Sequence, residues 1–177
     1  MMKVLYYDCF SGISGDMNLG AMIDLGIDVS FLRSELDKLN LEGWELISEK
    51  SQRHGISGTK VTVRQTKHEH VHRHLPDIER IIKGSALSDK VKDLSMKIFM
   101  RIAEAESKVH GVALNHVHFH EVGAIDSIID IAGAAICYTC LLYTSDAADE
   151  LLCVDLVGRR IIKKKNTSTK DVSTLSI

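Results

Sequence analysis

The sequence predicts an α+β domain in which a small mixed or antiparallel sheet packs against helices. Residues 44–50 and 58–66 have the composition and alternation of two strands, and residues 53–58 form a glycine-punctuated loop between them. Other stretches place apolar residues at helical spacing and end at glycines. The 177 residues are 45% hydrophobic, which suits one domain with a buried core. We expect two histidine-rich segments at one edge of the sheet.

The first elements combine a strand, a turn and a helix. Residues 3–7 predict a buried strand because they are rich in β-branched and aromatic side chains. A turn over residues 8–16 leads into a helix with Ser14 or Asp16 as its N-cap and Gly26 as its stop. Free backbone N–H groups ahead of this helix can cradle an anion, but a tight turn with a helix cap is the simpler interpretation. The candidate cofactor-binding residues of the turn are Ser11, Gly12, Ser14, Gly15 and Asp16.

Three further helices are predicted from apolar residues at helical spacing and from residues that begin or end a helix. A helix over residues 30–39 is expected to bury Phe31, Leu32, Leu36 and Leu39. A short helix begins with Pro76 and ends at Gly84. A longer helix is capped by Ser88 and stopped by Gly111. Its apolar positions are Val91, Leu94, Ile98, Phe99, Ile102 and Val109.

Histidines are concentrated in two segments. Seven of the nine lie within residues 68–74 and 116–120, where they alternate with other residues. In an extended chain, alternate residues share one face, and Glu121 follows the second segment directly. A helix then leaves Asp126 and Asp130 one turn apart, with an apolar stripe of Ile125, Ile128, Ile129, Ala132 and Ile136. Imidazole and carboxylate groups gathered in this way favour a divalent transition metal. An adventitious metal-binding surface loop is the alternative.

Composition excludes several classes of function. The formal net charge of −2 and the single proline argue against a basic nucleic-acid-binding protein and against disorder. No apolar run approaches the roughly 20 residues that span a membrane, and the first residues do not have the pattern of a signal peptide. The four cysteines form no dense disulfide framework, so we expect a cytoplasmic protein.

Several separated segments together resemble the LarC family of nickel-insertion proteins, over the chain from its first residues to about residue 135. The segments are residues 4–20 (VLYYDCFSGISGDMNLG), 55–57, 72–79, 103–111 and 117–130 (VHFHEVGAIDSIID). The joint pattern carries the resemblance, because no single segment is specific by itself.

The resemblance implies a CTP-dependent nickel insertion enzyme, a lyase or cyclometallase, that makes the nickel-pincer cofactor of lactate racemase. Its substrate is pyridinium-3,5-bisthiocarboxylic acid mononucleotide, and CTP is hydrolysed to CMP and pyrophosphate. In the family, CTP and a divalent metal bind a C-terminal domain that this sequence does not include. The chain alone is therefore expected to be inactive, and a homo-oligomer is a candidate assembly. A non-catalytic nickel-binding or storage module and an anion-binding fold with incidental histidines are the alternatives.

The resemblance also suggests which residues handle nickel. His118, His120 and Glu121 are the proposed holders of Ni²⁺, and His72 and His74 deliver the ion or complete the site. Asp126 and Asp130 are expected to orient an imidazole or to cap their helix. Asp8 and Asp16 are either ligands or residues of the turn. The full set that follows the family pattern is Asp8, Asp16, His72, His74, His118, His120, Glu121, Asp126 and Asp130.

The end of the chain has a different character. We interpret residues 1–139 as a truncated family domain and residues 140–177 as a tail without structural meaning. Residues 140–165 can be encoded by the two adapter sequences of a transposase-based sequencing library in their proper order, and residues 166–177 are also treated as foreign. A lineage-specific C-terminal extension is the alternative.

Overall fold

The computed structural model describes residues 3–67, 73–114, 117–119, 123–147, 154–155, 160–161 and 171–176. Its helices are α1 (Gly15–Asp24), α2 (Val29–Asp37), α3 (Leu75–Gly84), α4 (Asp89–His110) and α5 (Ile125–Ala147). Its strands are β1 (Lys3–Asp8), β2 (Trp44–Arg53), β3 (Ile56–Gln65), β4 (Arg73–His74), β5 (His118–Phe119), β6 (Val154–Asp155), β7 (Arg160–Ile161) and β8 (Asp171–Ser176). The α+β prediction is confirmed.

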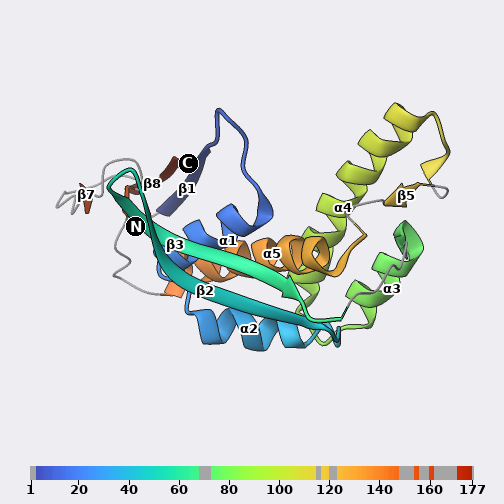
Figure 1. The fold of residues 1–177 in the computed structure, drawn as a ribbon, viewed down its shortest axis with the longest axis horizontal. Helices are drawn as coiled ribbons and strands as arrows, with labels where there is room; N and C mark the ends of the chain where they lie inside the picture. The colour runs from blue at the N-terminus through green and yellow to red at the C-terminus, as the bar shows by residue number, and fades with distance from the viewer. Residues whose placement is uncertain are drawn as a thin grey trace.

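A long antiparallel hairpin, β2–β3, lies across the helices (Figure 1). Its strands stay paired until Arg53 faces Ile56, so only His54 and Gly55 form the turn. Both residues have positive φ, 50° and 83°, as in the two-residue turns that match the twist of a hairpin. The predicted loop over residues 53–58 is therefore wrong, because pairing continues almost to the turn.

Helix α5 forms the centre of the core. It contacts α1, α2, α4 and β3, and Figure 1 shows it running behind the hairpin between α1 and α2. The predicted stripe is buried throughout: Ile125, Ile128, Ile129, Ala132 and Ile136. Burial on several sides explains why this helix carries a larger share of apolar residues than the others.

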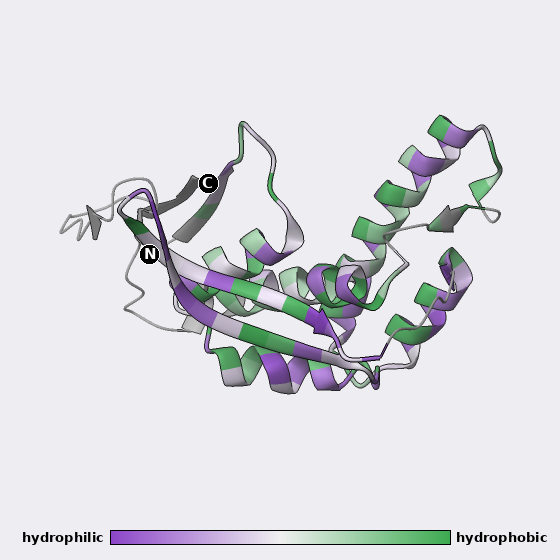
Figure 2. Cartoon of the chain, in the orientation of Figure 1, coloured by the Kyte–Doolittle hydropathy of each residue, from purple (hydrophilic) through white to green (hydrophobic). Residues whose placement is uncertain are grey.

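The outer helices are amphipathic, with apolar and polar residues alternating along them in Figure 2. In α2, Leu32 and Leu36 are buried, but Phe31 is 39% exposed, against the prediction. Phe31 lies about 100° around the helix from Leu32 and points away from the buried face. In α4, Phe99 is buried, whereas Val109, another apolar position of this helix, is 79% exposed. Val109 lies in the last turn of α4, where the helix extends past its neighbours (Figure 1).

Strand β1 exists as predicted, but its predicted burial is wrong. Tyr6 is 51% exposed and Tyr7 is 38% exposed. Among the described residues β1 pairs only with β8, in parallel, and does not join β2–β3. A central strand of a sheet is covered by packed elements on both faces, and β1 does not have such cover at Tyr6 and Tyr7.

The last 38 residues are partly described. Helix α5 continues to Ala147, β6 pairs with β7, and β8 pairs with β1. The division between residues 1–139 and 140–177 stays a prediction. No helix in the described part of the chain is both long and apolar enough to cross a membrane.

Candidate functional site

The two histidine-rich segments meet in the fold. Strand β4 pairs antiparallel with β5, and the register places His74 opposite His118 and Arg73 opposite Phe119. The guanidinium of Arg73 donates a hydrogen bond from Nη1 to the carbonyl oxygen of Gly123 at 3.0 Å. Phe119 is buried and its ring meets that of Phe99 edge to face, with centroids 6.3 Å apart. The backbone therefore makes one histidine from each segment a cross-strand neighbour of the other.

The other predicted ligands do not gather around this histidine pair among the described residues. His72, His120 and Glu121 lie outside the described residues, and Asp8 is an exposed residue at the end of β1. Among the residues that the structure describes, no group of three or more histidines, cysteines or carboxylates is arranged to hold a metal ion. In the same part of the chain, β4 and β5 pair only with each other. The structure therefore does not show the histidine-rich segments at an edge of the β2–β3 sheet, where the sequence analysis expected them.

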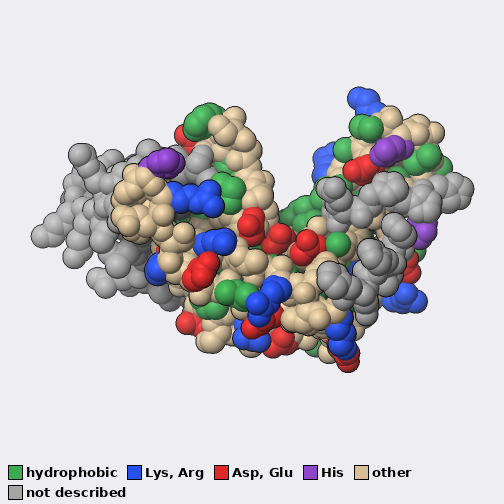
Figure 3. Space-filling view, in the orientation of Figure 1, with side chains coloured by type: hydrophobic (Ala, Val, Ile, Leu, Met, Phe, Trp, Pro, Cys, Tyr) green, Lys and Arg blue, Asp and Glu red, His purple; other side chains and the backbone are tan. Residues whose placement is uncertain are grey.

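A cluster of carboxylates forms where the first turns of α1 and α5 approach each other. Asp16 lies in the first turn of α1, and Asp126 and Asp130 lie one turn apart near the start of α5. Burial, with the negative charges of Asp16 and Asp126 adding to it, raises the pKa of Asp130 to about 7. Acidic side chains gather at the floor of a hollow between the α1 part of the molecule and the α3–α4 part (Figure 3).

Gly15 is what allows this approach. A Cβ atom at Gly15 would lie 2.3 Å from Oδ2 of Asp130, so a larger residue would push α1 away from α5. The other oxygen, Oδ1 of Asp130, is buried and has no hydrogen-bond partner in the described segments. A carboxyl group with a pKa near neutrality can take up or release a proton under physiological conditions, and the ionised cluster attracts cations.

The turn before α1 is organised by Asp16. Ser14 occupies the predicted N-cap position, but its hydroxyl donates to Oδ1 of Asp16 at 2.5 Å instead of capping the helix. The N–H of Met17 also donates to that oxygen, at 2.9 Å. Ser11 and Gly12 are exposed, and Gly12 has a φ of +82°. Of the predicted cofactor-binding residues, Ser14 and Asp16 line a pocket, whereas Gly15 packs against α5.

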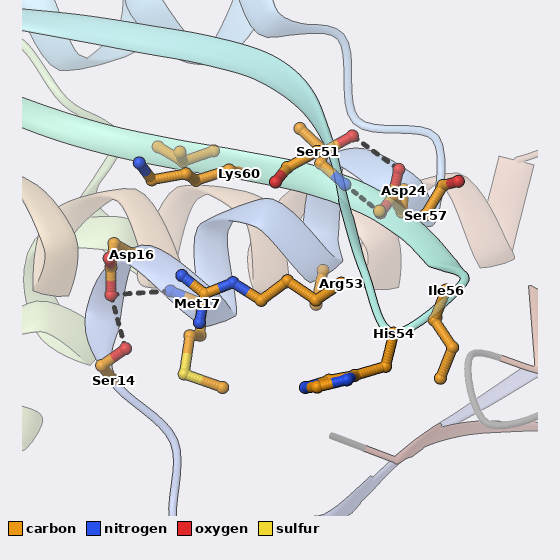
Figure 4. A pocket seen from close by; sticks show the side chains of 14 residues that line it. Ser14, Asp16, Met17, Asp24, Ser51, Arg53, His54, Ile56, Ser57 and Lys60 are labelled. Carbon is orange, nitrogen blue, oxygen red and sulfur yellow. Dashed lines mark hydrogen bonds between the residues drawn. The ribbon is translucent and has the colours of Figure 1, made fainter.

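This pocket, of about 630 Å³, lies between α1 and the end of the β2–β3 hairpin. The helix contributes Ser14, Asp16 and Met17, and the hairpin contributes three basic side chains, Arg53, His54 and Lys60 (Figure 4). Sequence reasoning missed these three residues. For Arg53 and His54 the sequence signal is the Arg-His-Gly turn, which becomes informative only once the hairpin is known to fold over α1, and Lys60 lies farther along β3.

Asp24 fastens the hairpin to α1. Its Oδ2 accepts a hydrogen bond from the N–H of Thr59 at 2.8 Å, and its Oδ1 accepts from Oγ1 of Thr59 at 2.6 Å. Nζ of Lys50 donates to Oδ1 at 2.7 Å. Burial opposes ionisation of Asp24, but these hydrogen bonds and the charge of Lys50 together lower the pKa of the carboxyl below its ordinary value.

Asp24→Asn is expected to lower the free energy of unfolding by about 1 kcal/mol at neutral pH, because the charged hydrogen bonds are lost. A carboxyl with a lowered folded-state pKa stabilises the protein above its unfolded pKa of about 4, and that stability is lost as the pH falls. The difference between the variant and the parent should therefore shrink below about pH 4. Urea unfolding at pH 7 and pH 3 measures it. Asp37→Asn, at an exposed position in the last turn of α2, is the control and should show no such loss.

Comparison with known proteins gives the family. A family model described as nickel insertion protein matches residues 5–155, and the chain belongs to this family. The resemblance to the LarC family is thereby confirmed. The matched region passes residue 139, where the predicted natural part ends.

Individual relatives carry more specific names. The chain is 56% identical over 148 residues to the pyridinium-3,5-bisthiocarboxylic acid mononucleotide nickel insertion protein of Clostridium kluyveri, covering 77% of this chain and 37% of that protein. It is 51% identical over 169 residues to the protein of the same name from Clostridium acetobutylicum, covering 77% of the chain and 40% of the relative. A putative nickel insertion protein of Geotalea uraniireducens is 51% identical over 138 residues, covering 77% of this chain and 35% of the relative. The chain thus spans well under half the length of these relatives. No solved structure matches it.

Proposed function

We propose that the chain is part of an enzyme that inserts nickel into pyridinium-3,5-bisthiocarboxylic acid mononucleotide. Membership of the nickel insertion family and the names of relatives at 51–56% identity support this substrate. The structural observation that carries the proposal is the β4–β5 register, in which His74 of one histidine segment faces His118 of the other. Imidazole is a favourable ligand for Ni²⁺, and two histidine segments that meet can contribute ligands to one ion.

In this proposal nickel is the cargo of the site. His118, His120 and Glu121 hold the ion, and His72 and His74 deliver it or complete the ligand set. Asp126 and Asp130 lie on α5, a few residues after the second histidine segment, and orient an imidazole. Ligands must be deprotonated, so nickel affinity falls below about pH 6, where imidazoles take up protons.

The rest of the reaction belongs to the longer protein. We propose CTP-dependent lyase chemistry in the cytoplasm, in which CTP and a divalent metal bind a domain outside this sequence and the product becomes the nickel-pincer cofactor of lactate racemase. The chain covers only 37% of the Clostridium kluyveri relative, so this activity is proposed for the whole protein.

Calorimetric titration with Ni²⁺ tests the nickel site. The chain is expected to bind nickel with submicromolar affinity at pH 7.5, and a variant with His118→Ala and His120→Ala should bind at least tenfold more weakly. The matched control replaces His54 and His110, the two histidines outside both segments, with alanine and should bind like the parent. Equal loss in the two double variants, or no loss in either, would count against this site.

A nickel-binding or storage module without chemistry is the second candidate. The same register supports it, because paired histidines can hold nickel whether or not a reaction follows. The two functions separate in the longer protein: insertion requires CTP and consumes the mononucleotide, whereas storage requires neither. Nickel transfer measured with and without CTP distinguishes them.

A further inference from the structure

We infer that β1 and the turn after it form an interface for the remainder of the longer protein, which adds a strand parallel to β1 and an apolar layer over its outer face. This β1 face consists of Tyr6 on the strand and Phe10 and Ile13 in the turn. Figure 1 shows β1 and the β4–β5 pair at opposite ends of the molecule. A failure of the proposed nickel site would therefore leave this interface in place.

The sequence of β1 is that of a strand covered on both faces. Val4 to Tyr7 form a continuous apolar run, which is typical of parallel strands inside a protein. One face is covered in this chain. Leu5 packs partly buried against the core. On the same face, burial, with the thiol of Cys137 on α5 adding to it, raises the pKa of Tyr7 to about 12. The inner face of β1 therefore lies on α5.

The other face of β1 is open. Successive side chains of a strand point to opposite faces, so Tyr6 points away from α5, and it is 51% exposed. In the turn that follows, Phe10 is 89% exposed and Ile13 is 36% exposed. Hydrophobic side chains are visible at the tip of this part of the molecule (Figure 3). Exposed apolar side chains that gather in one region are typical of a surface that another protein surface covers.

The edge of β1 is held by a strand from outside the family match. β8 pairs with β1 in parallel along its whole length, from Lys3 opposite Asp171 to Asp8 opposite Ser176. The family model ends at residue 155, before β8 begins. Two parallel strands alone make a weak sheet, because parallel sheets depend on cover over both faces. The pairing therefore marks an edge of β1 that accepts a parallel strand.

The course of α5 indicates which part of the longer protein supplies that strand. Figure 1 shows the C-terminal end of α5 on the side of the molecule where β1 begins. A strand that follows α5 and turns back along it would run in the direction of β1, as parallel strands joined through a helix do. The alignment covers only 37% of the Clostridium kluyveri protein, so that protein has ample further chain. The segment that follows α5 in the longer protein is therefore the occupant of this edge.

A chimera tests the interface. Residues 1–139 of this chain are joined to the remainder of the Clostridium kluyveri protein, which is 56% identical in the aligned region. Hydroxyl-radical labelling compares the chimera with the 177-residue chain. Tyr6 and Phe10 should be labelled about fivefold more slowly in the chimera, because the core of an interface excludes water. Val109, 79% exposed on α4, is the control and should be labelled equally in both proteins. Equal labelling of Tyr6 and Phe10 in the two proteins would overturn the interface.

The backbone amides of β1 report the added strand. The chimera does not contain β8, so protection of β1 there comes from the added part. A strand inside a covered sheet opens only with extensive unfolding, so its amide hydrogens should exchange about tenfold more slowly than in the 177-residue chain. The Clostridium kluyveri protein, which does not depend on folding of the chimera, should show the same slow exchange in the segment corresponding to β1. Fast exchange in that protein would overturn the added strand.

Tyr6→Lys distinguishes a covered side chain from an exposed one. In the 177-residue chain Tyr6 is half exposed, so the melting temperature should change little. In the chimera the ammonium group would be buried, and the melting temperature should fall by about 5 °C more. Val109→Lys is the matched control and should have the same small effect in both proteins. An equal effect of Tyr6→Lys in the two proteins would contradict the interface.

Analytical ultracentrifugation of the 177-residue chain tests a second copy as the occupant. We expect a monomer in which Tyr6 is labelled rapidly at every protein concentration. A dimer in which labelling of Tyr6 becomes slow would assign the β1 face to a second copy of the chain. That result would overturn the assignment to the remainder of the longer protein.

Discussion

Gly20→Ala is expected to lower the free energy of unfolding by about 2 kcal/mol. Gly20 is the point at which α1 lies directly on β3, and a Cβ atom there would be 2.3 Å from the backbone oxygen of Thr59. A backbone carbonyl cannot rotate away, so the helix must move from the strand, and overpacking of this kind costs about 1–3 kcal/mol. The gain in helix propensity on replacing glycine, about 1 kcal/mol, offsets only part of that cost.

Urea unfolding measures the effect, and Gly84→Ala is the matched control. Gly84 is also helical, as the last residue of α3, but a Cβ atom there would meet nothing within 4 Å. The control should be neutral or slightly stabilising. A Gly20 variant that is as stable as the control would show that α1 and β3 are not in such close contact.

Asp130→Asn is expected to remove most of the pH dependence of stability between about pH 4 and pH 7. Because the pKa of Asp130 is raised from 3.8 to about 7, the folded state holds this proton more tightly than the unfolded state. The parent therefore loses stability as the pH rises through this range, and the loss is complete above the folded pKa. A shift of this size corresponds to about 4 kcal/mol, and we expect about 2 kcal/mol because the carboxylate keeps partial access to water.

The measurement is urea unfolding at pH 4.5, 6 and 8. The asparagine variant should gain on the parent as the pH rises, and it should be the more stable protein at pH 8. Asp93→Asn, on the exposed side of α4, is the control and should leave the slope of the parent unchanged. A variant with the same slope as the parent would show that Asp130 ionises like an ordinary exposed carboxyl group.

Much of the fold is predictable because local patterns agree with the final packing. The apolar stripe from Ile125 to Ile136 is buried, and the glycine that ends α4, Gly111, has the left-handed φ of 64° that favours glycine. The errors have a common cause. The exposure of Tyr6 and Phe31 depends on which element lies against them, and periodicity alone does not contain that information.

The candidate sites show the same limit. Alternating histidines indicate metal ligands, but the contact between the segments depends on the pairing of His74 with His118, which are far apart in the chain. The place of Arg53 in the pocket depends on the hairpin turning over α1. The spacing of Asp126 and Asp130 is visible in the sequence, whereas the third carboxylate, Asp16, joins them only through helix packing at Gly15.

The β4–β5 pairing has a consequence for local stability. Two residues on each strand form the ladder, and it joins the two ends of the segment that contains α3 and α4. A ladder this short is weak by itself, and closing so long a loop has an entropic cost, so the packing of α3 on α4 must hold the strands together. Any ligand that bridges His74 and His118 therefore acts as a reversible cross-link across this loop. Its stabilisation would appear first as slower amide hydrogen exchange in α3 and α4, and much less in the β2–β3 hairpin.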